Sequence, residues 1–327
     1  MKAPPQRPPS DRVWTLKGES MGTTWSVRLV PPPGEREETF RAAIDQELTR
    51  IVALFSPWDR RSEISRFNAA PAGTWELSPE FWDLLNASLD LGDETNGAVD
   101  PTLGALVDLW GFGPPGPRDD AAPLPADDEI EAALAVSGWG RLRLNRDARA
   151  AMQPGGTRLD FSGIAKGHAV DCVSDRLTAL GATSHLVEIG GEVQGRGVKP
   201  DGQPWWVELE MPAGTPAPRT VVALVDVAMA TSGDWRRAFQ VDGKLYPHTI
   251  DGRTGRPVDN GLASVTVFDA SAMRADALAT ALTVMGPFEG PEYAEAMGLA
   301  AQFVERTPRG LVERLSPAFA AMLDEGE

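Results

Sequence analysis

Residues 184–270 contain a series of short strand-like segments that are separated by turn-forming residues, with no helical pattern between them. Parallel strands need a long crossover connection, usually a helix, whereas antiparallel strands can be joined by tight turns. This region therefore argues against a doubly wound parallel sheet. Helical patterns on either side, without strict alternation, predict an α+β fold with a mixed or largely antiparallel sheet core flanked by helices. The expected strands are Leu186–Ile189, Trp205–Glu210, Val221–Val225, Ala238–Val241 and Ala263–Phe268.

The other elements follow from periodicity and from start signals. Ser78 is a good N-cap, and Pro79 after it suits the first helical position. Strand pairs are expected within 13–30, around Leu142 and Ala151, and within 300–315. The expected helices cover residues 35–54, 79–95, 128–137, 162–180, 272–285 and 288–297, with a short helix inside 98–113 and a last helix that ends near Leu323.

Neither an internal repeat nor a linker divides the 327 residues, so we expect a single domain over residues 13–327. Residues 1–12 are rich in proline and are predicted to form a disordered tail. Residues 114–128 are rich in proline and aspartate, which predicts a flexible insertion.

Composition excludes several classes of protein. The formal net charge is −16 and no basic stripe is visible, which argues against a nucleic-acid partner. No apolar run reaches the length of a transmembrane helix. Cys172 is the one cysteine, so an intrachain disulfide and a cysteine-based zinc site are excluded. The N-terminus lacks the apolar region of a signal peptide, so a cytoplasmic location or a removed leader both stay open.

The segment Asp160–Asp171 has the features of an anion-binding site. It places Asp160, a Ser-Gly turn and Lys166 at the predicted start of a helix. Free backbone N–H groups at a helix start, together with a lysine, suit a pyrophosphate. Taken alone, such a segment is more often an ordinary helix start with a surface lysine.

The segment Ala275–Leu282 suggests a cation site. Asp276 and Thr280 are four residues apart, so on a helix they share one face. Carboxylate, hydroxyl and carbonyl oxygens suit Mg²⁺, which keeps open positions for phosphate oxygens. Taken alone, Asp276 is more often a helix cap or a solvated residue.

His248 follows a hairpin turn at Asp242-Gly243 and is a candidate general base for a hydroxyl nucleophile. A single loop histidine is more often structural. The aromatic residues Trp58, Trp110 and Phe112 lie near turns and are candidates to stack on an aromatic ligand, although tryptophan at element ends usually belongs to the core.

Together these weak signals resemble a known family. Eight segments, spread over roughly residues 18–286, look like the ordered motifs of the ApbE-type FAD:protein FMN transferases. The segments are Met21–Thr23, Ser62–Asn68, Asp100–Thr102 with Trp110–Gly113, Asp160–Asp171, Gly190–Gly191, Thr231–Asp234, His248–Pro257 and Ala275–Thr280.

The resemblance implies an enzyme that binds FAD and Mg²⁺ and transfers the FMN half onto a threonine hydroxyl of a partner flavoprotein, releasing AMP. It implies metal ligation by Asp276, Thr280 and the backbone carbonyl of Gly163. His248 is the candidate catalytic base, with Asp276 as the fallback. Two alternatives stay open, an FAD pyrophosphatase that releases FMN and AMP and a non-catalytic flavin-binding protein. The implied flavin-binding positions are Met21, Trp58, Asp100, Asp160, Lys166, His248 and Ile250.

Two residues depart from the family pattern. Trp58 stands where the family commonly has a tyrosine, which keeps a stacking face and loses a phenol hydroxyl. His168 stands where an aromatic tyrosine commonly follows Lys-Gly. We expect His168 to pack rather than to form a new polar contact.

Overall fold

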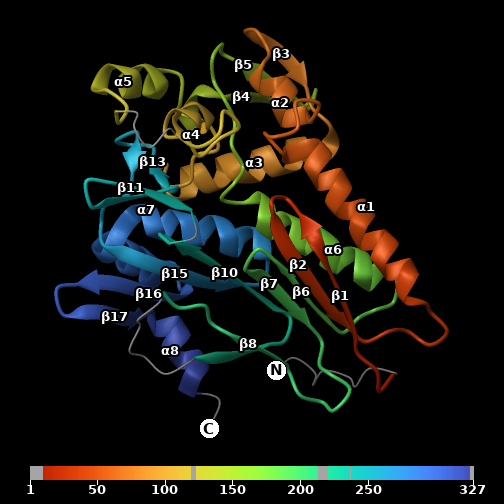
Figure 1. Ribbon diagram of the computed structural model, residues 1–327. Helices are drawn as coiled ribbons and strands as arrows, with labels where there is room; N and C mark the ends of the chain where they lie inside the picture. Colours follow the sequence, from red (N-terminus) through yellow and green to blue (C-terminus); the bar gives the residue numbers. More distant parts are fainter. Residues whose placement is uncertain (1–9, 119–122, 213–219, 236, 325–327) are drawn as a thin grey trace.

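The centre of the fold is an eight-stranded sheet, shown in the computed structural model of Figure 1. The structure describes residues 10–118, 123–212, 220–235 and 237–324. Neighbouring strands run in the order β1-β2-β6-β7-β10-β15-β16-β17, and each pair is antiparallel. The strands are β1 (Trp14–Ser20), β2 (Thr23–Leu29), β6 (His185–Ile189), β7 (Glu192–Arg196), β10 (Val227–Gly233), β15 (Leu262–Asp269), β16 (Ala300–Thr307) and β17 (Gly310–Leu315).

Two helices, α6 (Ala165–Ala179) and α7 (Ala272–Ala296), pack on one face of the sheet, and α1 (Glu37–Phe55) packs beside α6 (Figure 1). The two sheet-facing helices approach very closely at Gly167. A Cβ atom at Gly167 would lie 2.1 Å from the carbonyl oxygen of Ala272 and 2.8 Å from Cβ of Asp276. A side chain at this position is therefore excluded, and the first turns of α6 and α7 lie against each other.

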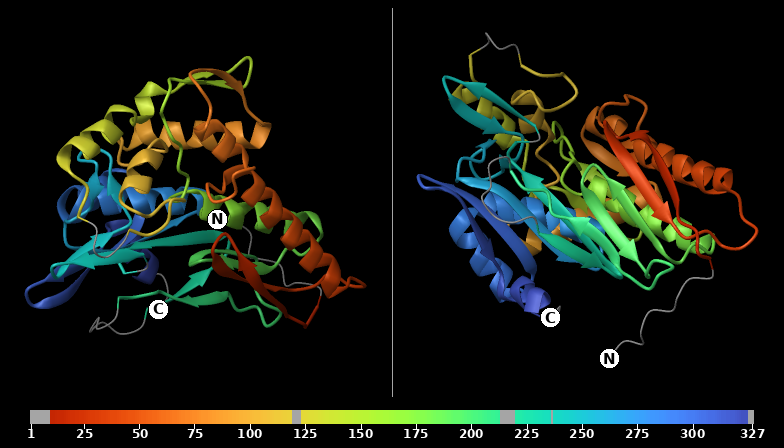
Figure 2. Two further views of the ribbon diagram at one scale, coloured as in Figure 1. Left: turned by 45° about the horizontal axis from the view of Figure 1, so that its top comes forward. Right: turned by 60° about the horizontal axis from the view of Figure 1, so that its bottom comes forward.

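The opposite face of the sheet is covered by α8 (Pro317–Asp324) and by the hairpin of β8 (Trp205–Glu208) and β9 (Val221–Leu224). Phe319 stacks on Phe268 with ring centroids 4.8 Å apart. Figure 2 shows the strands running from the β1–β2 hairpin, in red, to the β16–β17 hairpin, in blue. Apolar groups are thus buried on both faces of the sheet.

A further layer lies over α6 and α7 on the side away from the sheet (Figures 1 and 2). This layer includes α3 (Pro79–Glu94), and the predicted N-cap of that helix at Ser78 is confirmed, because the Ser78 hydroxyl accepts the Phe81 N–H at 3.4 Å. Two small strand pairs, β11–β12 and β13–β14, lie beside this layer. The elements are α2 (Glu63–Asn68), α3 (Pro79–Glu94), α4 (Gly104–Leu109), α5 (Asp127–Ala135), η1 (Trp139–Arg141), β3 (Gly73–Glu76), β4 (Arg143–Asn145), β5 (Ala150–Gln153), β11 (Ala238–Val241), β12 (Lys244–Pro247), β13 (Ile250–Asp251) and β14 (Arg256–Pro257).

The α+β fold with an antiparallel sheet is confirmed, but two central strands were missing from the sequence prediction. β7 and β10 carry alanine, threonine, glycine, glutamate and glutamine at buried positions and serine at a half-buried one, so neither shows the expected apolar alternation. The two helices expected at 272–285 and 288–297 both lie within α7, and helical geometry breaks between them at Gly286 (φ +83°, ψ −173°), as that expectation required.

The expected tail and insertion extend beyond the described residues. Of the tail, residues 10–12 are described and belong to no helix or strand, while residues 1–9 lie outside the described ranges. Of the expected insertion, residues 119–122 lie outside them as well. The last two residues of that segment, Asp127 and Asp128, already belong to α5.

Candidate active site

The predicted anion-binding segment lies at the start of α6. Lys166 is in the first turn, and its Nζ lies 2.5 Å from Oε1 of Glu192 on the central strand β7. Glu192 is 1% exposed, while the Lys166 side chain is 30% exposed. A Cβ at Gly190, where φ is +63°, would lie 3.4 Å from Cδ of Lys166 and 2.9 Å from the Thr23 side chain. Sheet residues therefore hold Lys166, and no sequence pattern had indicated Glu192 as its partner.

The predicted cation pair lies on α7, directly against that helix start. Asp276 is 4% exposed, and its Oδ2 accepts the backbone N–H of Gly167 at 3.0 Å. The hydroxyl of Thr280 lies 3.3 Å from the Ser232 hydroxyl, and a Cβ at Gly163 would lie 3.0 Å from Thr280 Oγ1. Gly163, Asp276 and Thr280 thus lie around one small region, with Ser232 beside them.

The start of α7 is fixed by Asp171 of α6, a residue in the same sequence motif as Lys166. Its carboxylate accepts the Ser271 hydroxyl at 2.7 Å, the Ala272 N–H at 2.9 Å and the Met273 N–H at 3.0 Å. Burial raises the pKa of the Asp171 carboxyl, and the three hydrogen bonds oppose this rise. The N-terminal end of α7 is thereby attached to α6, which fixes the register between Gly167 and Asp276.

Asp100 and Asp160 come together through backbone contacts. The Asp160 N–H donates to the Pro101 carbonyl at 2.8 Å. Asp100 accepts the Thr102 hydroxyl at 2.6 Å and the Trp139 N–H at 3.2 Å, while burial raises its pKa. A Cβ at Gly252 would lie 3.7 Å from Asp100 Oδ2, so the loop after Ile250 reaches the same place.

His248 follows β12 and its ring is held by the neighbouring hairpin. Its Nδ1 lies 3.0 Å from the Arg237 carbonyl oxygen, and its ring meets the Phe112 ring edge-on at a centroid distance of 6.3 Å. The Arg237 guanidinium donates to the Phe112 carbonyl at 2.9 Å. If the Nδ1 proton is donated to the Arg237 carbonyl, Nε2 carries the lone pair that a general base needs. Ile250, two residues later, is 6% exposed in the local apolar cluster.

Met21 lies in a turn near the Lys166 region, and Trp58 lies in an exposed position after α1. Met21 occupies the turn between β1 and β2 with φ +54°, next to Thr23, whose side chain lies beside Gly190. Trp58 follows α1 and is 54% exposed. Within the described ranges, the Trp58 side chain makes no hydrogen bond or ring contact with the other predicted site residues. Trp110, another of the stacking candidates, is 1% exposed and donates to the Gly255 carbonyl at 2.8 Å, so it is a core residue.

The other two histidines and the cysteine have structural environments. His168 packs edge-on against Phe55 at 5.6 Å, as expected, but contrary to that expectation its Nε2 also makes a polar contact with Cys172 Sγ at 3.5 Å. His185 is fully buried between Ser174 and the Ala182 carbonyl. Burial lowers the pKa of each histidine to about 4 and raises the pKa of the Cys172 thiol to about 11.

These histidines predict acid sensitivity of the fold. Each has a pKa lowered from 6.5 to about 4. Between pH 6.5 and pH 4 the unfolded chain therefore binds more protons than the folded protein, and the free energy of unfolding decreases as the pH is lowered. One such group corresponds to a loss on the order of 2 kcal/mol at pH 5 relative to neutral pH. His168→Phe keeps a ring against Phe55, so its unfolding free energy should fall less on acidification. Denaturant titrations at several pH values measure this, and parallel curves for the variant and the wild type would contradict it.

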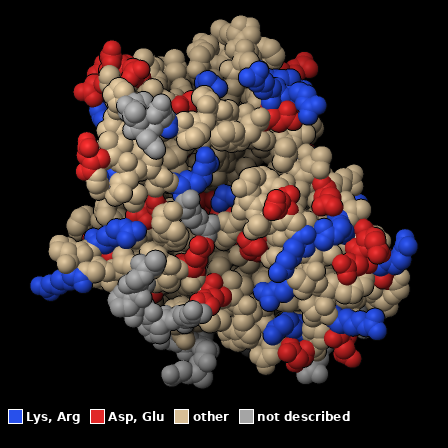
Figure 3. Space-filling model, in the orientation of Figure 1, with Lys and Arg blue, Asp and Glu red and all other residues tan. Residues whose placement is uncertain are grey.

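Two hollows lie near these residues. Figure 3 shows the molecular face hollowed between the outer layer and the sheet layer, with acidic and basic side chains on both sides. A separate cavity of about 620 Å³ lies beside the His248–Pro257 segment. Its lining contains Trp110, one of the stacking candidates, and none of the implied flavin-binding or metal-ligating residues. Its lining includes Trp110, Tyr246, Arg253, Asn260, Met285 and Phe288.

The model of the ApbE family matches residues 21–303. The chain belongs to the ApbE family. A relative named FAD:protein FMN transferase from Vibrio cholerae is 37% identical over 95% of this chain and 92% of the relative. A relative of the same name from Escherichia coli strain K12 is 32% identical over 98% and 92%.

Solved ApbE structures agree with the family assignment. The apo form of the flavinyl transferase ApbE from Pseudomonas stutzeri superposes with a TM-score of 0.89 at 38% identity, covering 97% of this chain and 98% of that one. The flavin transferase ApbE from Vibrio cholerae gives a TM-score of 0.86 at 35% identity, covering 95% and 99%. Over the described part of this ApbE family chain, none of the helices combines the length and apolarity needed to cross a bilayer.

Proposed function

We propose that the protein transfers the FMN half of FAD onto a threonine hydroxyl of an acceptor flavoprotein and releases AMP. Relatives named FAD:protein FMN transferase align over more than nine tenths of this chain and of their own length, which supports this reaction. The observation that carries the proposal is the hydrogen bond from Gly167 N–H to Asp276. This hydrogen bond connects the start of α6, where Lys166 could bind a pyrophosphate, to the face of α7 where Asp276 and Thr280 could bind a metal ion.

The residues around Asp276 fit a magnesium ion. Mg²⁺ prefers oxygen ligands and retains positions for substrate phosphates. The Asp276 carboxylate, the Thr280 hydroxyl and the Gly163 carbonyl would form such a donor set. Gly163 lies close to Thr280, because a Cβ atom at Gly163 would be only 3.0 Å from the Thr280 hydroxyl oxygen. Within the described ranges, no group of three or more His, Cys, Asp or Glu side chains could hold a metal ion. The donor set proposed here is of another kind, since it contains one carboxylate, one hydroxyl and one backbone carbonyl. When bound, the ion would neutralise charge on the pyrophosphate.

The remaining residues have separate roles in this proposal. Lys166 and the helix start bind and orient the pyrophosphate, and Trp58 offers an exposed ring for stacking on the flavin. The acceptor oxygen forms a bond to the FMN phosphorus, the bond from that phosphorus to the AMP oxygen breaks, and His248 takes the proton of the hydroxyl. Phosphoryl-type transfer depends mainly on alignment and charge neutralisation, which the Lys166 segment and the donor set on α7 would supply.

Mass spectrometry of products tests the function. The protein is incubated with FAD, Mg²⁺ and a candidate acceptor flavoprotein, and omission of each component is the control. An acceptor that gains the mass of FMN, with AMP released, supports the proposal. Free FMN and AMP with an unchanged acceptor would indicate a pyrophosphatase, and unchanged FAD would indicate a flavin-binding protein.

Lys166→Ala should weaken FAD binding more than it slows the reaction at saturating FAD. The ammonium would contact phosphate oxygens already in the ground state, so its loss is largely a loss of uniform binding. The measurement is an FAD titration followed by flavin fluorescence, with KM and kcat determined separately.

The same substitution also removes the ammonium beside buried Glu192. The double variant Lys166→Ala with Glu192→Gln removes both charges. It therefore separates the effect of losing the phosphate contact from the effect of leaving the buried Glu192 carboxylate without the Lys166 ammonium. FAD affinity equal to wild type in both variants would assign Lys166 a structural role.

A further inference from the structure

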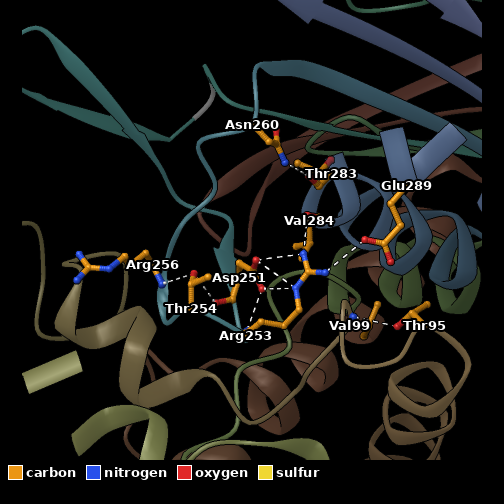
Figure 4. Close-up of polar contacts among 10 residues, drawn as sticks. All are labelled: Thr95, Val99, Asp251, Arg253, Thr254, Arg256, Asn260, Thr283, Val284 and Glu289. Atoms are coloured by element: carbon orange, nitrogen blue, oxygen red, sulfur yellow. Dashed lines mark hydrogen bonds and ion pairs between the residues drawn. The ribbon is translucent and has the colours of Figure 1, made fainter. Parts of the chain in front are cut away.

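The loop that carries His248 and Ile250 is attached to α7 through Arg253. The Arg253 guanidinium holds the Asp251 carboxylate at two points, with Nε 2.9 Å from Oδ1 and Nη2 3.1 Å from Oδ2 (Figure 4). The same Nη2 donates to the Val284 carbonyl at 3.2 Å. Nη1 lies 3.4 Å from Oε2 of Glu289, which is a longer contact to an exposed carboxylate.

Val284 lies near the end of the helical segment that begins at Ala272, carries Asp276 and Thr280, and breaks at Gly286. Helical geometry breaks at Gly286, and the last carbonyls before such a break have no partner within the helix. Arg253 takes the carbonyl of Val284, and Asn260 takes the carbonyl of Thr283 through Nδ2 at 2.8 Å (Figure 4). A cation at this end is also favoured by the helix dipole.

The loop has little other regular structure that could fix it. β13 and β14 pair over two residues each, Ile250–Asp251 with Arg256–Pro257. The Asp251 side chain is 15% exposed and also accepts the Arg253 N–H at 2.9 Å, so the turn and its guanidinium form one unit. This unit meets α7 through the Val284 carbonyl, and Asn260, later in the chain, takes the Thr283 carbonyl.

We propose that Arg253 is a positioning residue for transfer, because it fixes the loop of His248 against the α7 segment of Asp276 and Thr280. The inference rests on the proposed function, since it takes these residues as the base and the metal ligands. In-line transfer requires the acceptor oxygen, the phosphorus and the leaving oxygen to be aligned. A displacement of about 1 Å between catalytic groups can cost roughly a hundredfold in rate.

The test compares Arg253→Ala with Glu289→Gln, which keeps the guanidinium on Asp251 and Val284. We expect Arg253→Ala to lower kcat by about tenfold to a hundredfold, with a smaller change in KM for FAD. Arg253→Lys keeps the charge but not the two-point contact, so it should restore only part of the rate. Glu289→Gln should retain wild-type kcat.

Two further readouts distinguish positioning from general stability. Amide hydrogen exchange in the substrate-free protein should rise over residues 281–286 in Arg253→Ala and not in Glu289→Gln. Because the Arg253 side chain is 48% exposed beside a cavity, added methylguanidinium should reach the vacated position and raise kcat, whereas methylammonium should not.

Each outcome bears on the inference. Unchanged exchange over 281–286 in a folded Arg253→Ala protein would overturn it without reference to activity. Wild-type kcat in Arg253→Ala, or equal rescue by methylammonium, would also overturn it while leaving the proposed function intact. A wild-type protein that transfers no FMN to any acceptor would overturn both, and this result is distinguished by the wild-type assay alone.

Discussion

Replacing Asp276 by asparagine should reduce FMN transfer at least about a hundredfold, which corresponds to roughly 3 kcal/mol of transition-state stabilisation. Asparagine keeps the size and the helix position of the side chain but removes the anionic oxygen that a hard cation requires. Its amide oxygen can still accept the Gly167 N–H that Asp276 accepts at 3.0 Å. The fold should therefore survive, although the residue is 4% exposed.

Thr280→Val is the graded comparison for the Asp276 variant. It removes a neutral ligand at similar volume from a half-buried position, so transfer should fall less and should recover partly at high Mg²⁺. Initial rates against Mg²⁺ concentration, with thermal melts in the presence and absence of Mg²⁺ and FAD, measure both variants. Unfolding of Asp276→Asn, or an unchanged Mg²⁺ dependence, would make Asp276 a structural acid of the α6–α7 contact.

The fold class was predictable because turns and helices leave strong local signals. The β1–β2 hairpin, the Ser78 cap and the strand run after residue 184 all agree with the expected pattern. β7 and β10 were missed because buried central strands can carry small and polar side chains whose partners come from other elements. Gln194 of β7, for example, donates to the Ala270 carbonyl at 3.3 Å, across a long sequence separation.

The proximity of Asp276 and Thr280 to the Lys166 segment could be predicted for a different reason, since helical spacing places Asp276 and Thr280 on one face and family resemblance links them to that segment, while their roles stay predictions. The residues that support them could not be predicted in this way. Glu192, Ser232 and Arg253 act through contacts between elements far apart in the chain. Local signals existed, such as the Asp-Gly-Arg turn around Arg253, but nothing local indicates that its guanidinium reaches α7.

The assignment of His248 as general base predicts that His248→Gln lowers kcat by about a hundredfold to ten-thousandfold, the range typical of a lost proton acceptor. The glutamine amide can still donate to the Arg237 carbonyl, which the His248 Nδ1 approaches to 3.0 Å, so the loop should keep its conformation. KM for FAD should change much less than kcat, because a base acts on the acceptor hydroxyl and not on the bound dinucleotide.

The pH dependence of kcat gives the decisive measurement for His248. A histidine base must be neutral to accept a proton, so wild-type kcat should fall on the acidic side of the profile, and this fall should be absent from the residual activity of His248→Gln. His168→Phe is the matched control, because His168 packs against Phe55 and its loss should leave the profile unchanged. An acidic fall retained in His248→Gln, together with loss of FAD affinity, would assign His248 to flavin binding and leave Asp276 as the remaining candidate base.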